Sequence, residues 1–191
     1  MKKTVLLLVF VLAGCTDAPE RRADEAPPPA PVTTTSSVVK LPPRPKDIAL
    51  DRLDPCQILD ASQRKQLNLD NPPSPYVEPS FGNAKACTIR SNTSANVARL
   101  ALVTASGVDV WLSDNAQVDR KISAINGYAA ITVRTPDLDD VCNVEVDVAE
   151  GQFLDVMFRD GGNTPPTQQD HLCLGAMRVA EFALAGLLHT R

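Results

Sequence analysis

The sequence contains few of the residues from which catalytic sites are commonly built. Its two histidines, His171 and His189, both lie near the C-terminal end. A catalytic triad needs a base together with a residue that orients it, so these histidines leave little for nucleophile–base catalysis. The Gly-x-Ser-x-Gly, Walker and dinucleotide-binding glycine patterns are absent. We therefore predict no catalytic residue, no cofactor and no enzymatic activity.

The N-terminal segment carries an export signal. Lys2 and Lys3 precede an apolar run over residues 5–12, which is too short to span a bilayer permanently. The following Leu12-Ala13-Gly14-Cys15 resembles the lipobox of bacterial lipoproteins. In such proteins the peptide is cleaved before the cysteine, whose thiol carries a diacylglycerol. We expect a signal peptide over residues 1–14, a lipidated Cys15 and an extracytoplasmic location at the cell membrane. The alternative is an ordinary secretory signal with an incidental cysteine.

The charge balance excludes several partners. The chain has 23 acidic and 19 basic residues, a net charge of −4. An acidic surface repels phosphate backbones and anionic lipid head groups. We therefore expect no nucleic-acid partner, and we expect the lipid on Cys15 to provide the membrane attachment.

Residues 15–46 are predicted to form a disordered tether. Residues 16–46 hold eight of the sixteen prolines and the run Thr33-Thr34-Thr35-Ser36-Ser37. Such a segment cannot bury enough apolar surface to offset its ordering entropy. Either O-linked glycosylation or a plain solvated spacer is compatible with this composition. Residues 47–191, about 145 in number, are enough for a single domain with its own core.

Four cysteines remain beyond Cys15, namely Cys56, Cys87, Cys142 and Cys173. An even number in an exported chain predicts two disulfides. Metal binding is the rival interpretation, but there is no Cys-x-x-Cys pair to support it. Four cysteines allow three pairings, and their spacing alone does not choose among them.

The domain opens with helix signals. Asp54 can cap a helix that has Pro55 at its first position, and Asp60 with Gln63 repeats a capping pattern, so the helix should kink or restart there. We expect it to end near Leu69. The prolines that follow predict a loop over residues 71–83.

Six segments have strand character: 86–91, 96–104, 120–125, 128–134, 141–148 and 152–159. Residues 108–112 are apolar and ambiguous. Asn126-Gly127 predicts a tight hairpin turn. Alternation over 141–148 predicts that Cys142 and the valines face the core, with Asn143, Glu145 and Asp147 in water. Asp155 is expected on the polar face of the next strand.

The last element is predicted to be a long helix. Thr167 can cap it, and its apolar residues recur with helical spacing. A membrane-surface helix is the alternative, but positive charge is sparse. We expect an α+β fold, with an antiparallel sheet of five to six strands packed by this helix, a short N-terminal helix and two disulfides. No apolar stretch beyond the leader is expected to span a membrane.

The order of these pieces resembles a large family of actinobacterial lipoproteins known only by a domain of unknown function. One departure is Thr88-Ile89 after Cys87, where many relatives have an aromatic residue. From the resemblance and from sequence proximity we expect the disulfides Cys56–Cys87 and Cys142–Cys173. The family carries no activity that could be transferred. The resemblance rests on the lipobox ending at Cys15, the tether, Asp54-Pro55-Cys56, Cys87, the Asn126-Gly127-Tyr128-Ala129 turn, Cys142 with Val146-Asp147-Val148, and Cys173.

The remaining candidate residues have ordinary structural explanations. The cluster Asp137, Asp139 and Asp140 could hold Ca²⁺, but it lacks the spacing of an EF-hand and is better explained as a solvated loop. Asp160 is expected in a solvated turn. The single tryptophan, Trp111, could anchor a partner but is expected at the edge of the core.

Three functions remain. The first is a non-catalytic binding or interaction module of the cell envelope, for an envelope protein, a wall polymer or a small ligand. The second is a sensory accessory domain in envelope signalling. The third is a hydrolase or transferase that uses carboxylates alone. We favour the first because no reactive group of residues stands out.

Overall fold

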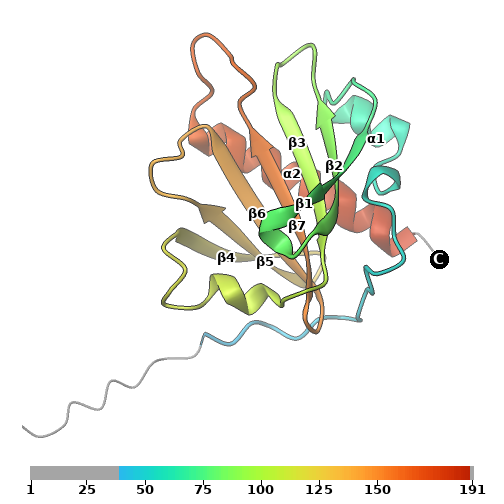
Figure 1. The fold of residues 1–191 in the computed structure, drawn as a ribbon, viewed down its shortest axis with the longest axis vertical. Helices are drawn as coiled ribbons and strands as arrows, with labels where there is room; N and C mark the ends of the chain where they lie inside the picture. Colours follow the sequence, from blue (N-terminus) through green and yellow to red (C-terminus); the bar gives the residue numbers. More distant parts are fainter. Residues whose placement is uncertain (1–38, 190–191) are drawn as a thin grey trace, which may run out of the picture. The chain divides into compact units, whose positions relative to one another are not determined.

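The computed structural model describes residues 39–189, and within that part seven strands form one antiparallel sheet in the order β1-β2-β3-β7-β6-β5-β4 (Figure 1). The strands are β1 Ser74–Glu78, β2 Ala84–Arg90, β3 Val97–Val103, β4 Asp119–Ile125, β5 Tyr128–Arg134, β6 Val141–Ala149 and β7 Gln152–Arg159. The helices are α1 Ala61–Gln66 and α2 Gln169–His189, with 3-10 helices η1 Pro55–Gln57, η2 Pro79–Phe81 and η3 Val108–Trp111.

The predicted α+β class, the antiparallel sheet, the long C-terminal helix and the presence of two disulfides are confirmed. The predicted number of strands is wrong, because the segment assigned to a loop over 71–83 contains β1. Pro75 lies inside that strand. A proline is tolerated there because β1 is an edge strand that pairs only with β2.

The opening helix is interrupted where the second capping pattern begins. The Asp54 side chain accepts a hydrogen bond from the backbone N–H of Cys56 and caps η1. Asp60 then forms a capping box with Gln63, and α1 starts after it. The C-terminal helix starts at Gln169, so Thr167 lies outside it and does not occupy the predicted cap position.

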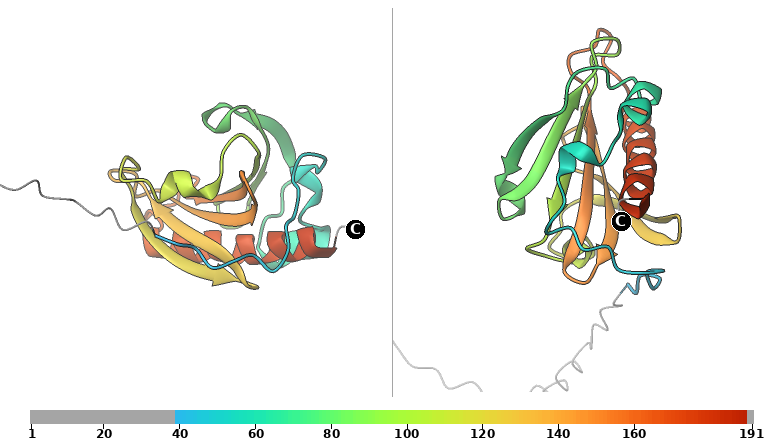
Figure 2. Two further views of the ribbon diagram at one scale, coloured as in Figure 1. Left: turned by 90° about the horizontal axis from the view of Figure 1, so that it is seen from below. Right: turned by 90° about the vertical axis from the view of Figure 1, so that its right-hand side faces the viewer.

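The long helix α2 covers one face of the sheet (Figure 2). Although α2 is long and apolar enough to cross a membrane by composition, its apolar stripe is buried in the domain core. Close approach of its last turns to η1 requires a glycine, because a Cβ on Gly186 would lie 2.2 Å from the carbonyl oxygen of Ile58. The buried stripe comprises Leu172, Cys173, Ala176, Val179, Ala180, Ala183, Leu184 and Leu187.

The other side of the sheet, called the second face below, carries a smaller apolar cluster. Phe81 of η2 packs edge-on against Phe153 of β7 and against Trp111 of η3. The ambiguous segment 108–112 is thus a short helix, and Trp111 lies at the edge of a core as expected. The buried residues of this second apolar cluster are Ala84, Val103, Val108, Ile131, Val133 and Phe153.

Two disulfides tie the helical segments to the sheet. Cys56 of η1 is joined to Cys87 of β2, and Cys142 of β6 is joined to Cys173 in the first turns of α2. These are the pairs that the family resemblance implies. Each bridge joins residues 31 positions apart.

The chain enters the domain beside the hairpin between β6 and β7. Arg44 donates two hydrogen bonds, of 2.9 and 2.8 Å, to the Asp147 carboxylate. The N–H of Ile48 donates to the carbonyl of Val148, and Leu41 packs against the second apolar cluster. Residues 41–46, assigned to the tether from the sequence, therefore contact the domain. The predicted signal peptide, Cys15 and the tether up to residue 38 lie outside the described residues.

The equal loop lengths of the two bridges lead to a testable expectation. The double substitutions C56A/C87A and C142A/C173A should each lower the free energy of unfolding by about 3–4 kcal/mol, because each frees a loop of the same length in the unfolded chain. Urea unfolding of each variant beside the wild type measures the loss. Peptide mapping without reductant should recover the two pairs above. A Cys56–Cys142 peptide, or unchanged stability, would contradict the described bridges.

Candidate functional site

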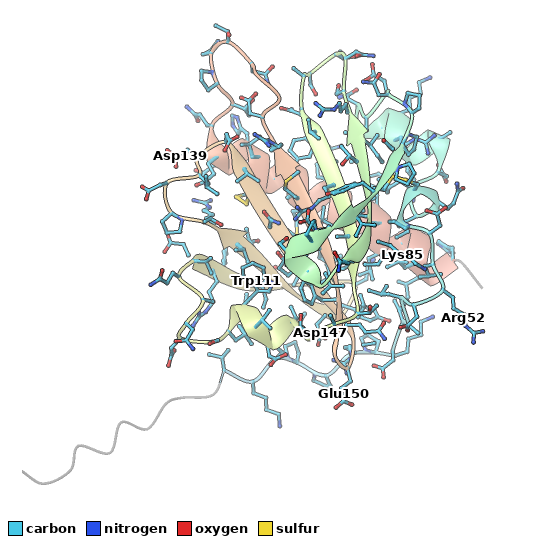
Figure 3. All side chains as sticks on the ribbon, in the orientation of Figure 1. Arg52, Lys85, Trp111, Asp139, Asp147 and Glu150 are labelled. Carbon is cyan, nitrogen blue, oxygen red and sulfur yellow. A yellow bond between two sulfur atoms is a disulfide. The ribbon has the colours of Figure 1, made fainter. Side chains whose placement is uncertain are left out.

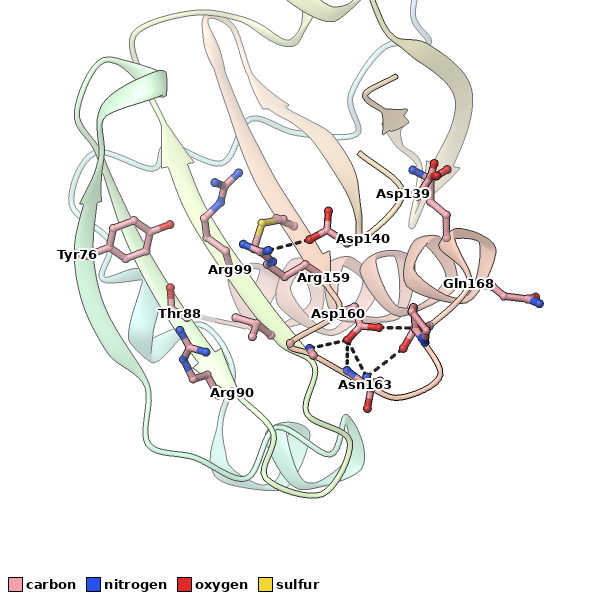
Figure 4. Close-up of a pocket in the computed structure, with 17 residues that line it drawn as sticks. Tyr76, Thr88, Arg90, Arg99, Asp139, Asp140, Arg159, Asp160, Asn163 and Gln168 are labelled. Carbon is pink, nitrogen blue, oxygen red and sulfur yellow. Dashed lines mark hydrogen bonds and ion pairs between the residues drawn. The ribbon is translucent and has the colours of Figure 1, made fainter. Parts of the chain in front are cut away.

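A pocket of about 1100 Å³ opens on the second face, at the end of the sheet where β2 and β7 finish (Figure 4). Its floor comes from β1, β2, β3 and β7. Its walls come from residues 139–140 and from the connection that leads from β7 into α2. Most of the lining side chains are polar or charged.

Strand register brings three arginines to this pocket. Arg90, Val97 and Arg159 are paired directly across β2, β3 and β7. Two residues further along the same strands, on the same face, Thr88 is paired with Arg99. Since directly paired residues lie on the same face of a sheet, three neighbouring strands each contribute one arginine to the pocket, as Figure 4 shows.

Arg99 is held by two acids, of which Asp155 is fully buried and Glu78 is partly buried. Its Nε and Nη2 donate to Asp155 at 3.0 and 2.7 Å, and its Nη1 donates to Glu78 at 2.8 Å. The guanidinium carbon also lies 5.6 Å from the centre of the Phe81 ring. Only 13% of the Arg99 side chain is exposed. Arg99 is therefore a fixed part of the pocket floor.

Behind Arg99 lies a pair of buried carboxyl groups. Glu145 and Asp155 face each other directly across β6 and β7, and both are fully buried. Burial, followed by the negative charge of Asp155, raises the pKa of Glu145 well above its ordinary value. Asp155 accepts hydrogen bonds from Arg99 and from Asn143, at 2.6 Å from the latter. Asp155 is therefore the ionised member of the pair and Glu145 holds the proton.

The other two arginines are less constrained. Arg159 forms an ion pair with Asp140 at 2.8 Å, in which both side chains are about half exposed. Arg90 is exposed, and its guanidinium has no hydrogen bond or ion pair within residues 39–189. These two cations are the ones available to a ligand.

Asp160 shapes the wall of the pocket. Its carboxylate accepts hydrogen bonds from the backbone N–H groups of Gly162, Asn163 and Thr167, which lowers the pKa of Asp160. Gly161 is required beside it, because a Cβ there would lie 1.7 Å from the carbonyl oxygen of Ala95. The loop is thus locked in place by its own backbone.

Several expected positions are corrected. Glu145, Asp147 and Asp155 were expected in water but are buried, and Asp160 is also buried. The cause is that η2, η3 and the N-terminal segment pack against the second face of the sheet, and the Arg99 side chain lies against Asp155, so these polar side chains lie under protein. Alternation in the sequence distinguishes the two faces, and it does not reveal what covers the second one.

The remaining candidates do not converge into one centre. Asp139 and Asp140 line the pocket, whereas Asp137 does not. No group of three potential metal ligands occurs among the described residues. His171 and His189 lie near opposite ends of α2, both exposed. The sequence did not predict the three pocket arginines, Arg90, Arg99 and Arg159, as site residues. Its only signal was Arg99, which is an arginine within an otherwise apolar strand.

The buried pair predicts a pH effect that can be measured. Below about pH 4.5, the ordinary value for Glu145, both folded and unfolded chains hold its proton. Above it, the unfolded chain releases the proton while the folded chain keeps it. Stability of the wild type relative to E145Q should therefore fall as the pH rises from 4.5 toward the raised folded-state value. Urea unfolding of both proteins between pH 4 and 7 measures this difference, and a difference that stays constant would contradict the assignment.

The matched variant D155N should behave differently. It removes the charge that neutralises buried Arg99 and should cost about 3–5 kcal/mol at pH 7. Equal stability of E145Q and D155N would show that the proton is not on Glu145.

Comparison with known proteins identifies a family. Residues 10–185 match a family described as protein of unknown function (DUF3558). No curated protein and no solved structure matches the chain. Because the match covers most of the sequence, the chain belongs to this family of proteins of unknown function.

Proposed function

We propose that the protein is a membrane-anchored extracytoplasmic lipoprotein whose folded domain is a non-catalytic binding module of the cell envelope. The observation that carries the proposal is the open pocket with three arginines, which lies at the end of the sheet opposite the entry of the N-terminal segment.

Export is supported by two independent features. The lipobox-like Leu12-Ala13-Gly14-Cys15 ends a positively charged apolar leader. The two disulfides are typical of proteins that fold in an oxidising compartment.

The position of the pocket suits a tethered receptor. The N-terminal segment meets the sheet at Asp147 and Val148, where β6 ends, whereas the pocket lies where β7 ends. Asp147 is paired with Phe153, and the six residue steps along β7 from Phe153 to Arg159 separate the two sites by roughly 20 Å at the usual rise per residue. Figure 3 shows Asp147 and Glu150 at one end of the domain and Asp139 at the other. The described N-terminal segment therefore joins the domain at the end of the sheet away from the pocket.

The acids of the domain support binding over acid–base chemistry. A general acid must come within hydrogen-bond reach of its substrate. Glu145 and Asp155 are fully buried, and neither lines the pocket. Asp160 is fully engaged by its own loop. Glu145 and Asp155 therefore lie below the pocket, where a ligand does not reach them, and the Asp160 carboxylate in the pocket wall is held by its own loop.

Photocrosslinking in the cells that produce the protein tests this role. A photoreactive amino acid is placed at Thr88 or Gln168, which line the pocket, and in a control at Arg178, which is exposed on α2. Both pocket positions should yield the same adduct mass, and the control should not. An absence of adducts at both pocket positions, or the same adduct at Arg178, would contradict a binding role.

The same cells test the anchor. The wild-type chain should fractionate with the membrane and begin at an acylated Cys15, whereas C15A should leave the membrane fraction or keep its leader. An unmodified Cys15 in the membrane-bound wild type would contradict the lipoprotein assignment.

A further inference from the structure

Resting on the binding function proposed above, we propose that the pocket recognises a carboxylate group of a polar ligand, which Arg90 and Arg159 hold between them. The three pocket arginines differ in their partners, and this difference points to the chemical class of the ligand.

Arg90 and Arg159 are placed to act on one group. They lie in the same cross-strand row with only Val97 between them, on β2 and β7. Neighbouring strands are about 4.8 Å apart, so the two backbones are separated by roughly 10 Å. Two long arginine side chains on the same face can reach a common anion over that distance. A guanidinium also matches the planar, two-oxygen geometry of a carboxylate.

Both cations are accessible to an incoming ligand. The guanidinium of Arg90 forms no ion pair within the described part of the chain. Arg159 is paired only with Asp140, and both of these side chains are about half exposed. Exposed ion pairs contribute little to stability. A ligand carboxylate can therefore replace Asp140 on Arg159 without disrupting the domain.

Arg99 differs, because Asp155 and Glu78 already neutralise it. It fixes the floor beneath the other two arginines and adds no free positive charge. The cations that remain open to a ligand are therefore Arg90 and Arg159, while the three aspartates of the lining, Asp139, Asp140 and Asp160, leave the pocket without excess positive charge.

The acidic rim limits the charge of the ligand. Asp139 and Asp140 line the same pocket. A phosphate monoester carries nearly two negative charges at neutral pH, and the second would face these aspartates. A carboxylate carries one. Polar groups nearby, from Tyr76, Thr88 and Gln168, suit an uncharged polar body attached to it.

A matched pair of probes tests the class directly. N-acetyl-trialanine with a free C-terminal carboxylate is titrated into the full chain, purified in detergent, and so is the same peptide as its C-terminal amide. Inorganic phosphate is the third probe. Backbone NMR shifts give both the dissociation constant and the location. The free acid should shift Thr88, Val97 and Gly161, and it should bind at least ~10-fold more tightly than the amide, as expected for charge-assisted hydrogen bonds.

Three variants separate this account from general charge effects. R90Q should weaken binding of the free acid about 10-fold. D140N should tighten it roughly 2–5-fold, because it removes the competitor on Arg159. R178Q makes the same charge change on α2, outside the pocket, and should leave the dissociation constant unchanged. The opposite effects of R90Q and D140N cannot both come from partial unfolding.

The inference is overturned if the free acid does not bind or the amide binds as tightly, if phosphate binds more tightly than the acid, or if R178Q weakens binding as much as R90Q. A failure here remains distinct from failure of the binding role. If Thr88 and Gln168 still crosslink to a common molecule in cells, the pocket binds a ligand of another class.

Discussion

The buried ion pair between Arg99 and Asp155 is the interaction on which the second face of the sheet depends. A carboxylate at a fully buried strand position is stable only when a cation and hydrogen bonds compensate for its lost solvation. Arg99 supplies that charge and also binds Glu78 on edge strand β1. One guanidinium thus links three strands of the sheet and holds η2, with Phe81, beside the apolar cluster. Because Asp155 carries the charge, Glu145 can remain neutral opposite it.

The two faces of the sheet have different roles. On one face, α2 and the segments around η1 bury a continuous apolar core, and two disulfides fasten these helical segments to β2 and β6. On the second face, short turns and the N-terminal segment cover only part of the surface. The pocket lies on this second face, which is the face of the sheet opposite α2.

The sequence predicts the local elements well where one physical signal dominates. Capping residues mark the start of η1 and of α1 at Asp54 and Asp60, and the apolar stripe marks α2. It misses β1, because Pro75 is unfavourable in a strand unless that strand lies at an edge. The sequence also predicts that Glu145 and Asp155 lie in water, whereas both are buried. Alternation of polar and apolar residues shows that the two faces of a strand differ, but it does not show whether the polar face is exposed. The pocket could not be predicted from the sequence, because Arg90 and Arg159 are brought to the same pocket only by the non-local pairing of β3 with β7.

The proposed carboxylate recognition requires that a ligand occupies Arg90 and Arg159 where the protein works. Arginine-specific labelling with a dicarbonyl reagent tests this most directly, in intact envelopes and in the purified chain, with exposed Arg178 as the internal standard. We predict that modification of Arg90 and Arg159 relative to Arg178 is suppressed in the envelope and recovers after purification. Equal relative modification in both preparations would contradict the claim.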